Sequence, residues 1–169
     1  MKKNDDIILE ITAVSGQGIG IGRIDGMAVF VEQTAVGDTV KAHIIKVKSN
    51  YAIGKLSEVV IPSADRAEVD CPVFKQCGGC SFRHINYEAE LRIKKHSVAD
   101  AMKRIGGIDL PPNEIIPSPS ICYYRNKAQY PVTKGDDGLA YGFFAKHSHR
   151  VIKSKSCLLQ PKLFDDVMR

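Results

Sequence analysis

Short runs of apolar residues with charged or polar neighbours fill the first third of the chain. They cover residues 7–14, 27–31, 39–48 and 51–56, and turn signals such as Asp25-Gly26 and Gly37-Asp38 lie between them. Several short strands separated by turns are typical of a small barrel. The pattern therefore predicts an all-β unit over about residues 7–61.

Four glycines alternate at Gly16, Gly18, Gly20 and Gly22. More strand follows them instead of a helix, so they lack the helix N-terminus that completes a phosphate-binding loop. Glycine at every second position of a strand leaves one face bare, which suits a barrel bend or a close backbone approach. We predict this second, structural role.

A helix is expected after residue 85. Asn86 can cap its start, Gly106-Gly107 ends it, and Lys103 and Arg104 occupy its last turn. An apolar stripe at helical spacing predicts the face that packs in the core, formed by Tyr87, Leu91, Val98, Met102 and Ile105.

A proline-rich connector over residues 110–120 leads to a second set of strands. Strands are expected over 123–132 and 139–144, joined as a hairpin across Gly135-Asp136-Asp137-Gly138, with a third strand at 148–152 and a helix opening at Pro161. The fold class is thus mainly β with an α+β second part. We expect a small OB-like barrel over residues 1–62, followed over 63–169 by a cysteine-bearing central domain with one long helix and an antiparallel sheet.

Three cysteines crowd one loop at Cys71, Cys77 and Cys80, and the fourth ligand of a metal site could be Cys157, Cys122 or His84. The sequence shows no leader-like start and no apolar run long enough to cross a bilayer, so we expect a cytoplasmic location, where disulfides are disfavoured. Three close thiolates with a remote fourth suit an iron–sulfur cluster. Zinc sites usually pair two knuckles, yet the spacing alone leaves zinc open.

The formal net charge is +5, a surplus that favours anionic partners. Lys46 and Lys48 lie two residues apart and hence on one strand face, opposite Ile45 and Val47, which are expected to point inward. A basic strip on a small barrel can meet nucleic-acid phosphates, and it can equally be a solvated face.

Residues 5–61, with Gly18, Gly20, Gly22, Gly37 and Gly54-Lys55-Leu56, resemble a TRAM domain, an RNA-binding barrel. The cysteine loop, Phe82-Arg83-His84-Ile85, Tyr124-Arg125-Asn126-Lys127 and Cys157-Leu158-Leu159-Gln160-Pro161 follow in an order that resembles the RNA (uracil-5-)-methyltransferase family with a four-iron, four-sulfur cluster. That resemblance implies cluster ligands at Cys71, Cys77, Cys80 and Cys157, with Cys122 as the spare cysteine.

The resemblance also implies a function. Family members use S-adenosylmethionine to methylate C5 of a uridine in structured ribosomal or transfer RNA. Their adenosylmethionine-binding domain and catalytic cysteine would lie beyond Arg169, so we expect an N-terminal part that is inactive alone and needs no obligate protein partner. The expected RNA contacts are Lys46, Lys48, Arg83, Arg125, Lys127 and Gln129.

Two other classes remain open. One is a stand-alone RNA-binding module with a structural zinc, which metal analysis would separate from the cluster-bearing enzyme part. The other is an electron carrier, against which the barrel and the basic strips count.

Overall fold

The computed structural model describes residues 1–135 and 138–168, and it forms two compact units. The first, which we call the barrel unit, contains Met1–Glu68 and Ser81–Ile116. The second, the cysteine unit, contains Val69–Cys80 and Pro117–Arg169. The units interleave along the chain, and the long helix expected in the central domain is grouped with the barrel.

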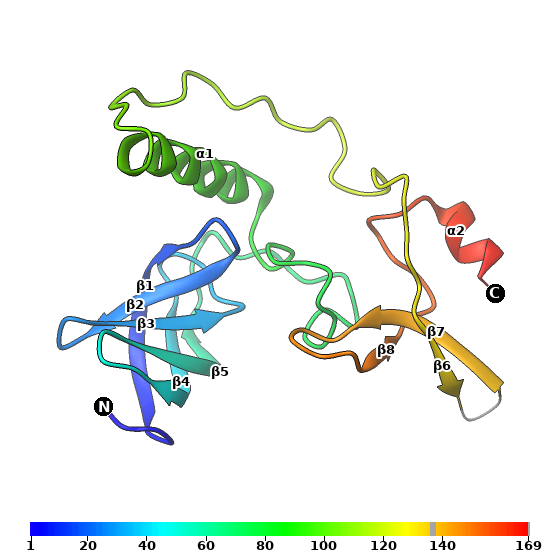
Figure 1. The fold of residues 1–169 in the computed structure, drawn as a ribbon, viewed down its shortest axis with the longest axis horizontal. Helices are drawn as coiled ribbons and strands as arrows, with labels where there is room; N and C mark the ends of the chain where they lie inside the picture. Colours follow the sequence, from blue (N-terminus) through cyan, green and yellow to red (C-terminus); the bar gives the residue numbers. More distant parts are fainter. Residues whose placement is uncertain (136–137, 169) are drawn as a thin grey trace. The chain divides into compact units, whose positions relative to one another are not determined.

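Five strands close into a barrel in the order β1-β2-β3-β5-β4 (Figure 1). The β3–β5 pair is parallel and every other neighbouring pair is antiparallel. The expected OB-like barrel is therefore confirmed. Its strands are β1 (Asp6–Val14), β2 (Ile19–Ile24), β3 (Met27–Glu32), β4 (Thr39–Val47) and β5 (Tyr51–Ile61).

Alternate residues of these strands fill the barrel with apolar side chains. Ile11, Val29, Val31 and Ile44 are completely buried, as period-2 patterning requires. On β2 the inward positions are glycines, because a Cβ at Gly20 would overlap Thr34 Oγ1. The glycines of β2 thus let Thr34 and the neighbouring backbone approach this strand closely. The segment that follows Gly16 and Gly18 is the strand β2 and not a helix, as predicted.

The predicted facing of Ile45 is wrong. Ile44 pairs with Gly54 and Lys46 with Ile53, so Ile45 is the extra residue of a β-bulge. A bulge resets the inward–outward alternation, and Ile45 is consequently 46% exposed. Lys46 and Lys48 remain exposed on either side of half-buried Val47.

A buried carboxylate fixes the chain where it leaves the barrel. Asp38 is completely buried and accepts hydrogen bonds from the backbone amides of Ala35 (2.6 Å) and Ser63 (2.9 Å) and from Arg66 Nε (2.8 Å). Arg66 also donates through Nη2 to the Gln33 carbonyl at 3.0 Å. A buried charge is tolerable only when it is paired and hydrogen-bonded in this way.

Helix α1 (Tyr87–Arg104) begins and ends as predicted, with the Asn86 side chain accepting from the Ala89 amide at 2.8 Å. The predicted core stripe is wrong at Val98 (51% exposed) and Ile105 (88% exposed), whereas Tyr87, Leu91 and Met102 are half-buried. The helix instead packs on the barrel core through Ala89 and Ile93, one and two turns beyond buried Ile85. Small Ala89 lets the helix approach closely, which a search for large apolar residues overlooks.

The cysteine unit contains a three-stranded antiparallel sheet in the order β6-β7-β8. Its elements are β6 (Val132–Gly135), β7 (Gly138–Phe144), β8 (Val151–Lys153) and helix α2 (Lys162–Val167). The β6–β7 hairpin is confirmed, although Asp136 and Asp137 of its predicted turn lie outside the described residues.

The strand predicted over 123–132 is wrong except for its last residue. Tyr123 has φ +58°, outside the β region, and Pro131 lacks an amide proton for a sheet ladder. The segment is held by two backbone bonds instead, from Tyr123 N to the Leu158 carbonyl (2.8 Å) and from Arg125 N to the Leu159 carbonyl (2.9 Å).

The close approach at Gly20 yields a stability prediction. Gly20→Ala should lower the free energy of unfolding by about 1–3 kcal/mol, because the new methyl overlaps Thr34 Oγ1 in a packed interior. Urea unfolding followed by circular dichroism measures the loss. In the Gly20→Ala/Thr34→Ala double variant part of the loss should return, since the obstructing oxygen is gone; strictly additive losses would contradict the packing account.

Candidate functional site

The cysteine loop is anchored to the turn between β7 and β8. Cys77 forms an antiparallel bridge with Ala145, and Gly78 N donates to the Phe144 carbonyl at 2.9 Å. A Cβ at Gly78 would lie 3.0 Å from that carbonyl oxygen, so glycine allows this approach. The loop and the hairpin are therefore one local structure, although about 65 residues of sequence separate them.

The environment of Cys77 shows which thiols surround it. Burial raises the pKa of the Cys77 thiol, the Gly79 amide (3.4 Å from Sγ) lowers it, and the negative charges of Cys71 and Cys157 raise it further. Those charges act on Cys77 because the three residues are neighbours in space. The structure thus places Cys157, from the C-terminal region, near Cys77 of the cysteine loop.

The other two candidates for the fourth ligand have different surroundings. His84 is 1% exposed in the barrel unit, and its Nε2 lies 3.1 Å from the Thr34 carbonyl oxygen. Cys122 is half-buried just after the proline-rich connector, where its carbonyl accepts from Ser120 Oγ at 2.6 Å. Neither observation links them to Cys77.

The four thiols of the cysteine unit have the chemistry of metal-cofactor ligands. Cys71, Cys77, Cys80 and Cys157 are all half-buried and all belong to the cysteine unit, and four thiolates are the usual ligands of iron–sulfur clusters and of structural zinc. Within residues 1–135 and 138–168 no three His, Cys, Asp or Glu side chains already stand in a geometry that holds a single metal ion. The ligand roles therefore stay a proposal.

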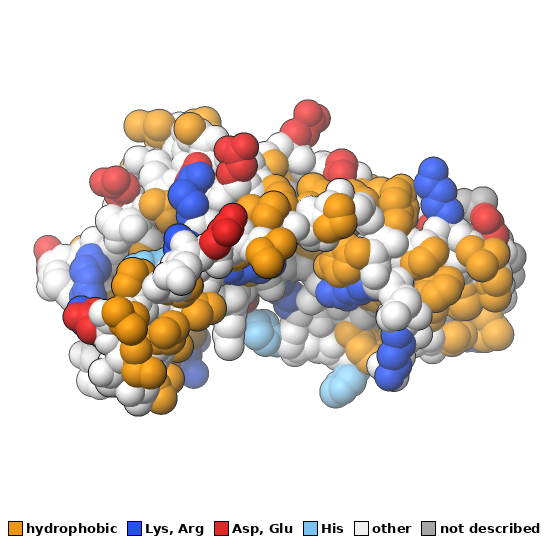
Figure 2. Space-filling view, turned by 90° about the horizontal axis from the view of Figure 1, so that it is seen from above, with side chains coloured by type: hydrophobic (Ala, Val, Ile, Leu, Met, Phe, Trp, Pro, Cys, Tyr) orange, Lys and Arg blue, Asp and Glu red, His pale blue; other side chains and the backbone are white. Residues whose placement is uncertain are grey.

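The apolar core of the cysteine unit is thin. Its described buried apolar residues are Phe74, Ala145, Ile152 and Leu159, whereas the barrel core contains twelve buried residues. Hydrophobic side chains also lie on the protein surface in Figure 2, and in the cysteine unit large apolar residues with more than 40% exposure include Ile121, Tyr124, Leu139, Leu163 and Val167. A small unit with so little burial usually depends on a cross-link or a metal.

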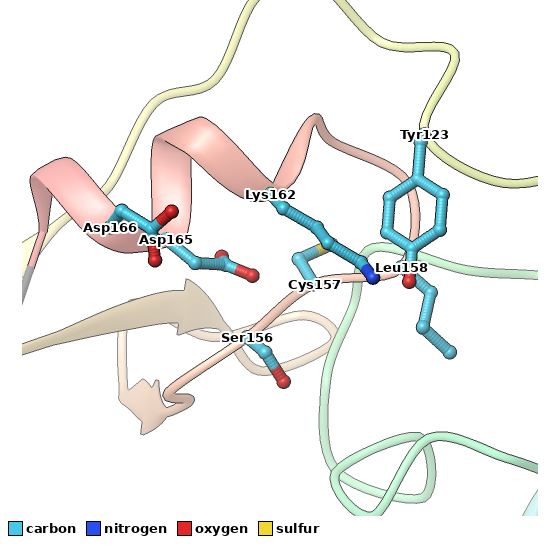
Figure 3. A pocket seen from close by; sticks show the side chains of 7 residues that line it. All are labelled: Tyr123, Ser156, Cys157, Leu158, Lys162, Asp165 and Asp166. Atoms are coloured by element: carbon cyan, nitrogen blue, oxygen red, sulfur yellow. The ribbon is translucent and has the colours of Figure 1, made fainter.

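A pocket of about 330 Å³ opens beside Cys157 (Figure 3). Lys162 extends from the start of α2 toward Tyr123, and its Nζ lies 5.5 Å from the ring centroid. Sequence reasoning missed this pocket, because its lining comes from two separate segments; the lining residues are Tyr123, Ser156, Cys157, Leu158, Lys162, Asp165 and Asp166.

The expected RNA contacts divide between the two units. Lys46 and Lys48 are exposed at the end of β4, and Arg83 is half-buried ahead of α1 in the same unit. Arg125, Lys127 and Gln129 are exposed in the cysteine unit, on the irregular segment bonded to Leu159. All of these residues except half-buried Arg83 are therefore exposed to solvent, as a residue that contacts RNA must be.

The barrel corresponds to a known domain. Residues 7–57 match the family model of the TRAM domain, which confirms the resemblance proposed for the barrel. The chain thus contains a TRAM domain.

The whole chain also has relatives. It is 39% identical over 169 residues to a protein of Clostridium tetani and 38% identical over 174 residues to one of Halalkalibacterium halodurans, both named uncharacterized RNA methyltransferases. All of this chain is covered in both comparisons, but only 37% of each relative. The chain therefore spans little more than a third of the length of these curated relatives.

A solved structure shares the fold. The Pyrococcus abyssi tRNA (uracil-54, C5)-methyltransferase, solved with S-adenosyl-L-homocysteine, superposes with a TM-score of 0.64 at 24% identity, covering 95% of this chain and 34% of that one. In addition, none of the helices in the described part of the chain is long and apolar enough to span a membrane.

Tyr130 provides a pH probe of the cysteine unit. Burial raises the pKa of its phenol, and the charges of Asp165, Cys157 and Tyr141 raise it further, while its hydroxyl donates to Gln160 Oε1. The folded state then binds the proton more tightly than the unfolded state. Its contribution to stability is complete below about pH 10 and is lost as the pH rises through the folded pKa.

An ultraviolet titration of phenolate checks this assignment. Among the six tyrosines, Tyr130 should ionise at the high-pH end, and Tyr130→Phe should remove that step. Tyr51→Phe is the matched control, since it should leave the high-pH step in place. Loss of a step at the ordinary tyrosine pKa in Tyr130→Phe would contradict the assignment.

Proposed function

We propose that this chain is the RNA-binding and cluster-binding part of an S-adenosylmethionine-dependent enzyme that methylates C5 of a uridine in ribosomal or transfer RNA. The observation that carries the proposal is the match of the whole chain, TRAM domain included, to proteins named RNA methyltransferases. The name of the Pyrococcus neighbour supports uracil C5 as the methylated atom, and its bound S-adenosyl-L-homocysteine supports S-adenosylmethionine as the methyl donor.

In this proposal Cys71, Cys77, Cys80 and Cys157 hold a four-iron, four-sulfur cluster. Three observations support it: the thiols share one unit, Cys71 and Cys157 act electrostatically on Cys77, and the unit's own apolar core is thin. A bound cluster would supply a cross-link between the cysteine loop and the segment around Cys157. Metal closure of so long a loop stabilises the folded state, because it restricts the unfolded chain.

The chain's own residues would bind and orient the RNA. Lys46 and Lys48 on the barrel, together with Arg83, Arg125, Lys127 and Gln129, present donors for phosphate and base edges. A uridine must leave its stack before C5 can be reached, so firm backbone contacts on both sides are part of the task. The nucleophile that activates C5 and the methyl donor would come from the remainder of the parent enzyme, in the cytoplasm and without an obligate protein partner.

Metal and sulfide content tests the cluster. The anaerobically purified chain should be brown and contain iron and acid-labile sulfide, and Cys157→Ser should lose both because one ligand is gone. Cys122→Ser is the matched control and should keep them. Stoichiometric zinc without sulfide, even after anaerobic reconstitution, would contradict the cluster and favour a stand-alone RNA-binding module with structural zinc.

A chimera tests the enzymatic part. The matching segment of the Clostridium tetani relative is replaced by this chain, and the product is incubated with an unmodified ribosomal or transfer RNA transcript and S-adenosylmethionine. Nucleoside mass spectrometry should detect 5-methyluridine with the chimera and none with this chain alone. A methyl group on another base, or on the ribose, would refute the proposed specificity.

A further inference from the structure

The net positive charge of the chain belongs to one of its two units. The barrel unit contains fourteen Lys and Arg against fourteen Asp and Glu, so its formal charge is zero. The cysteine unit contains the remaining ten Lys and Arg against five Asp and Glu, and it therefore holds the whole surplus of +5. A TRAM barrel would be expected to supply the attraction for RNA, yet the unit that contains this barrel has no net charge.

Ion pairs compensate some cations of the chain and leave others without a carboxylate partner among the described residues. In the barrel unit several cations are neutralised locally, as in Arg66–Asp38 (2.8 Å), Arg92–Asp65 (2.6 Å) and Lys103–Asp109 (3.0 Å). In the cysteine unit, by contrast, no Asp or Glu of the described residues lies within ion-pair distance of Arg150 or Lys155. Their charge remains available to an external anion.

These cations lie on an acid-free stretch. Residues 138–164 contain no Asp or Glu but include Lys146, His147, His149, Arg150, Lys153, Lys155 and Lys162. We call residues 146–155 the basic turn. It comprises most of the loop after β7, the short strand β8 and the two residues that follow β8 toward Cys157. Within it Arg150, Lys153 and Lys155 are exposed.

The basic turn is an ordered structure. Ala145 N donates to the Arg150 carbonyl at 2.9 Å, Ser148 N donates to the Ala145 carbonyl at 3.2 Å, and Arg150 N donates to Ser148 Oγ at 3.0 Å. His149 packs edge-on against Phe144 with ring centroids 5.4 Å apart. Because Ala145 also bridges to Cys77, the turn is anchored at its base by the cysteine loop.

We propose that the basic turn is the main phosphate-binding surface of this chain for RNA, and that the barrel contributes less of the electrostatic attraction. This inference rests on the proposed function, which identifies RNA as the partner. Uncompensated Lys and Arg side chains on a rigid support bind a polyanion by releasing its counterions, which makes binding steeply salt-dependent but indifferent to sequence. The turn would position the RNA, and base recognition would fall to other residues.

Salt-dependent RNA binding tests the proposal with three matched two-charge variants. They are Arg150→Gln/Lys155→Gln in the basic turn, Lys46→Gln/Lys48→Gln on the barrel, and Lys103→Gln/Arg104→Gln at the end of α1. Fluorescence anisotropy with a labelled transfer RNA transcript gives Kd over a range of salt concentrations. Thermal melts show that each variant is folded.

The basic-turn variant should bind roughly tenfold more weakly at low salt. The slope of log K against log salt should fall by about two, because two phosphate contacts are lost. The barrel variant should show a clearly smaller loss of affinity and a clearly smaller change of slope. The α1 variant should stay closest to wild type, since Lys103 and Arg104 are already paired with Asp109 and Asp100.

Two results would overturn the proposal in distinguishable ways. If the barrel variant loses as much affinity and slope as the basic-turn variant, or more, the basic turn is not the main surface, while RNA binding itself stands. If the wild-type chain binds no RNA at low salt, both this inference and the RNA-binding role fail together.

Discussion

The cysteine unit depends on holding together two segments that are far apart in the sequence. Residues 69–80 meet the hairpin of residues 138–153 through the Cys77–Ala145 bridge and the Gly78 amide, and Cys157 arrives beside Cys77. Ordering so long an intervening chain costs conformational entropy, and four buried apolar residues offset little of it. A cross-link at the cysteines would meet this constraint, which is why the cluster is central to the proposed function.

The barrel unit faces no comparable constraint. Its strands close on themselves, its core is continuous, and buried Asp38 fixes the exit of the chain through the Ser63 amide and Arg66. It also has no net charge. The two units therefore differ in their physical character: the barrel unit has a continuous apolar core, whereas the cysteine unit has a thin core and holds the surplus positive charge.

Local signals in the sequence predicted most of the fold. Turn residues and the alternation of apolar and polar residues located the barrel strands. The Asn86 cap and Gly106-Gly107 marked the two ends of α1. The wrong predictions concern features that tertiary contacts determine. The bulge at Ile45 depends on register against β5, and the buried face of α1 was chosen by small Ala89 fitting the barrel. Spacing singled out Cys71, Cys77 and Cys80 but left the fourth ligand open, and only the fold shows that Cys157 lies near Cys77 and that the surplus charge lies in one unit.

The central claim is that the cysteine loop is closed onto Cys157 by a bound cluster, and hydrogen exchange monitored by mass spectrometry tests it most directly. The anaerobically purified chain is compared with the same chain after chelation and removal of iron. The account predicts that residues 71–80 and 145–157 lose protection on removal, while the barrel strands keep theirs. Equal protection of the cysteine loop in both samples would contradict the claim, because the thiols would then be held by packing alone.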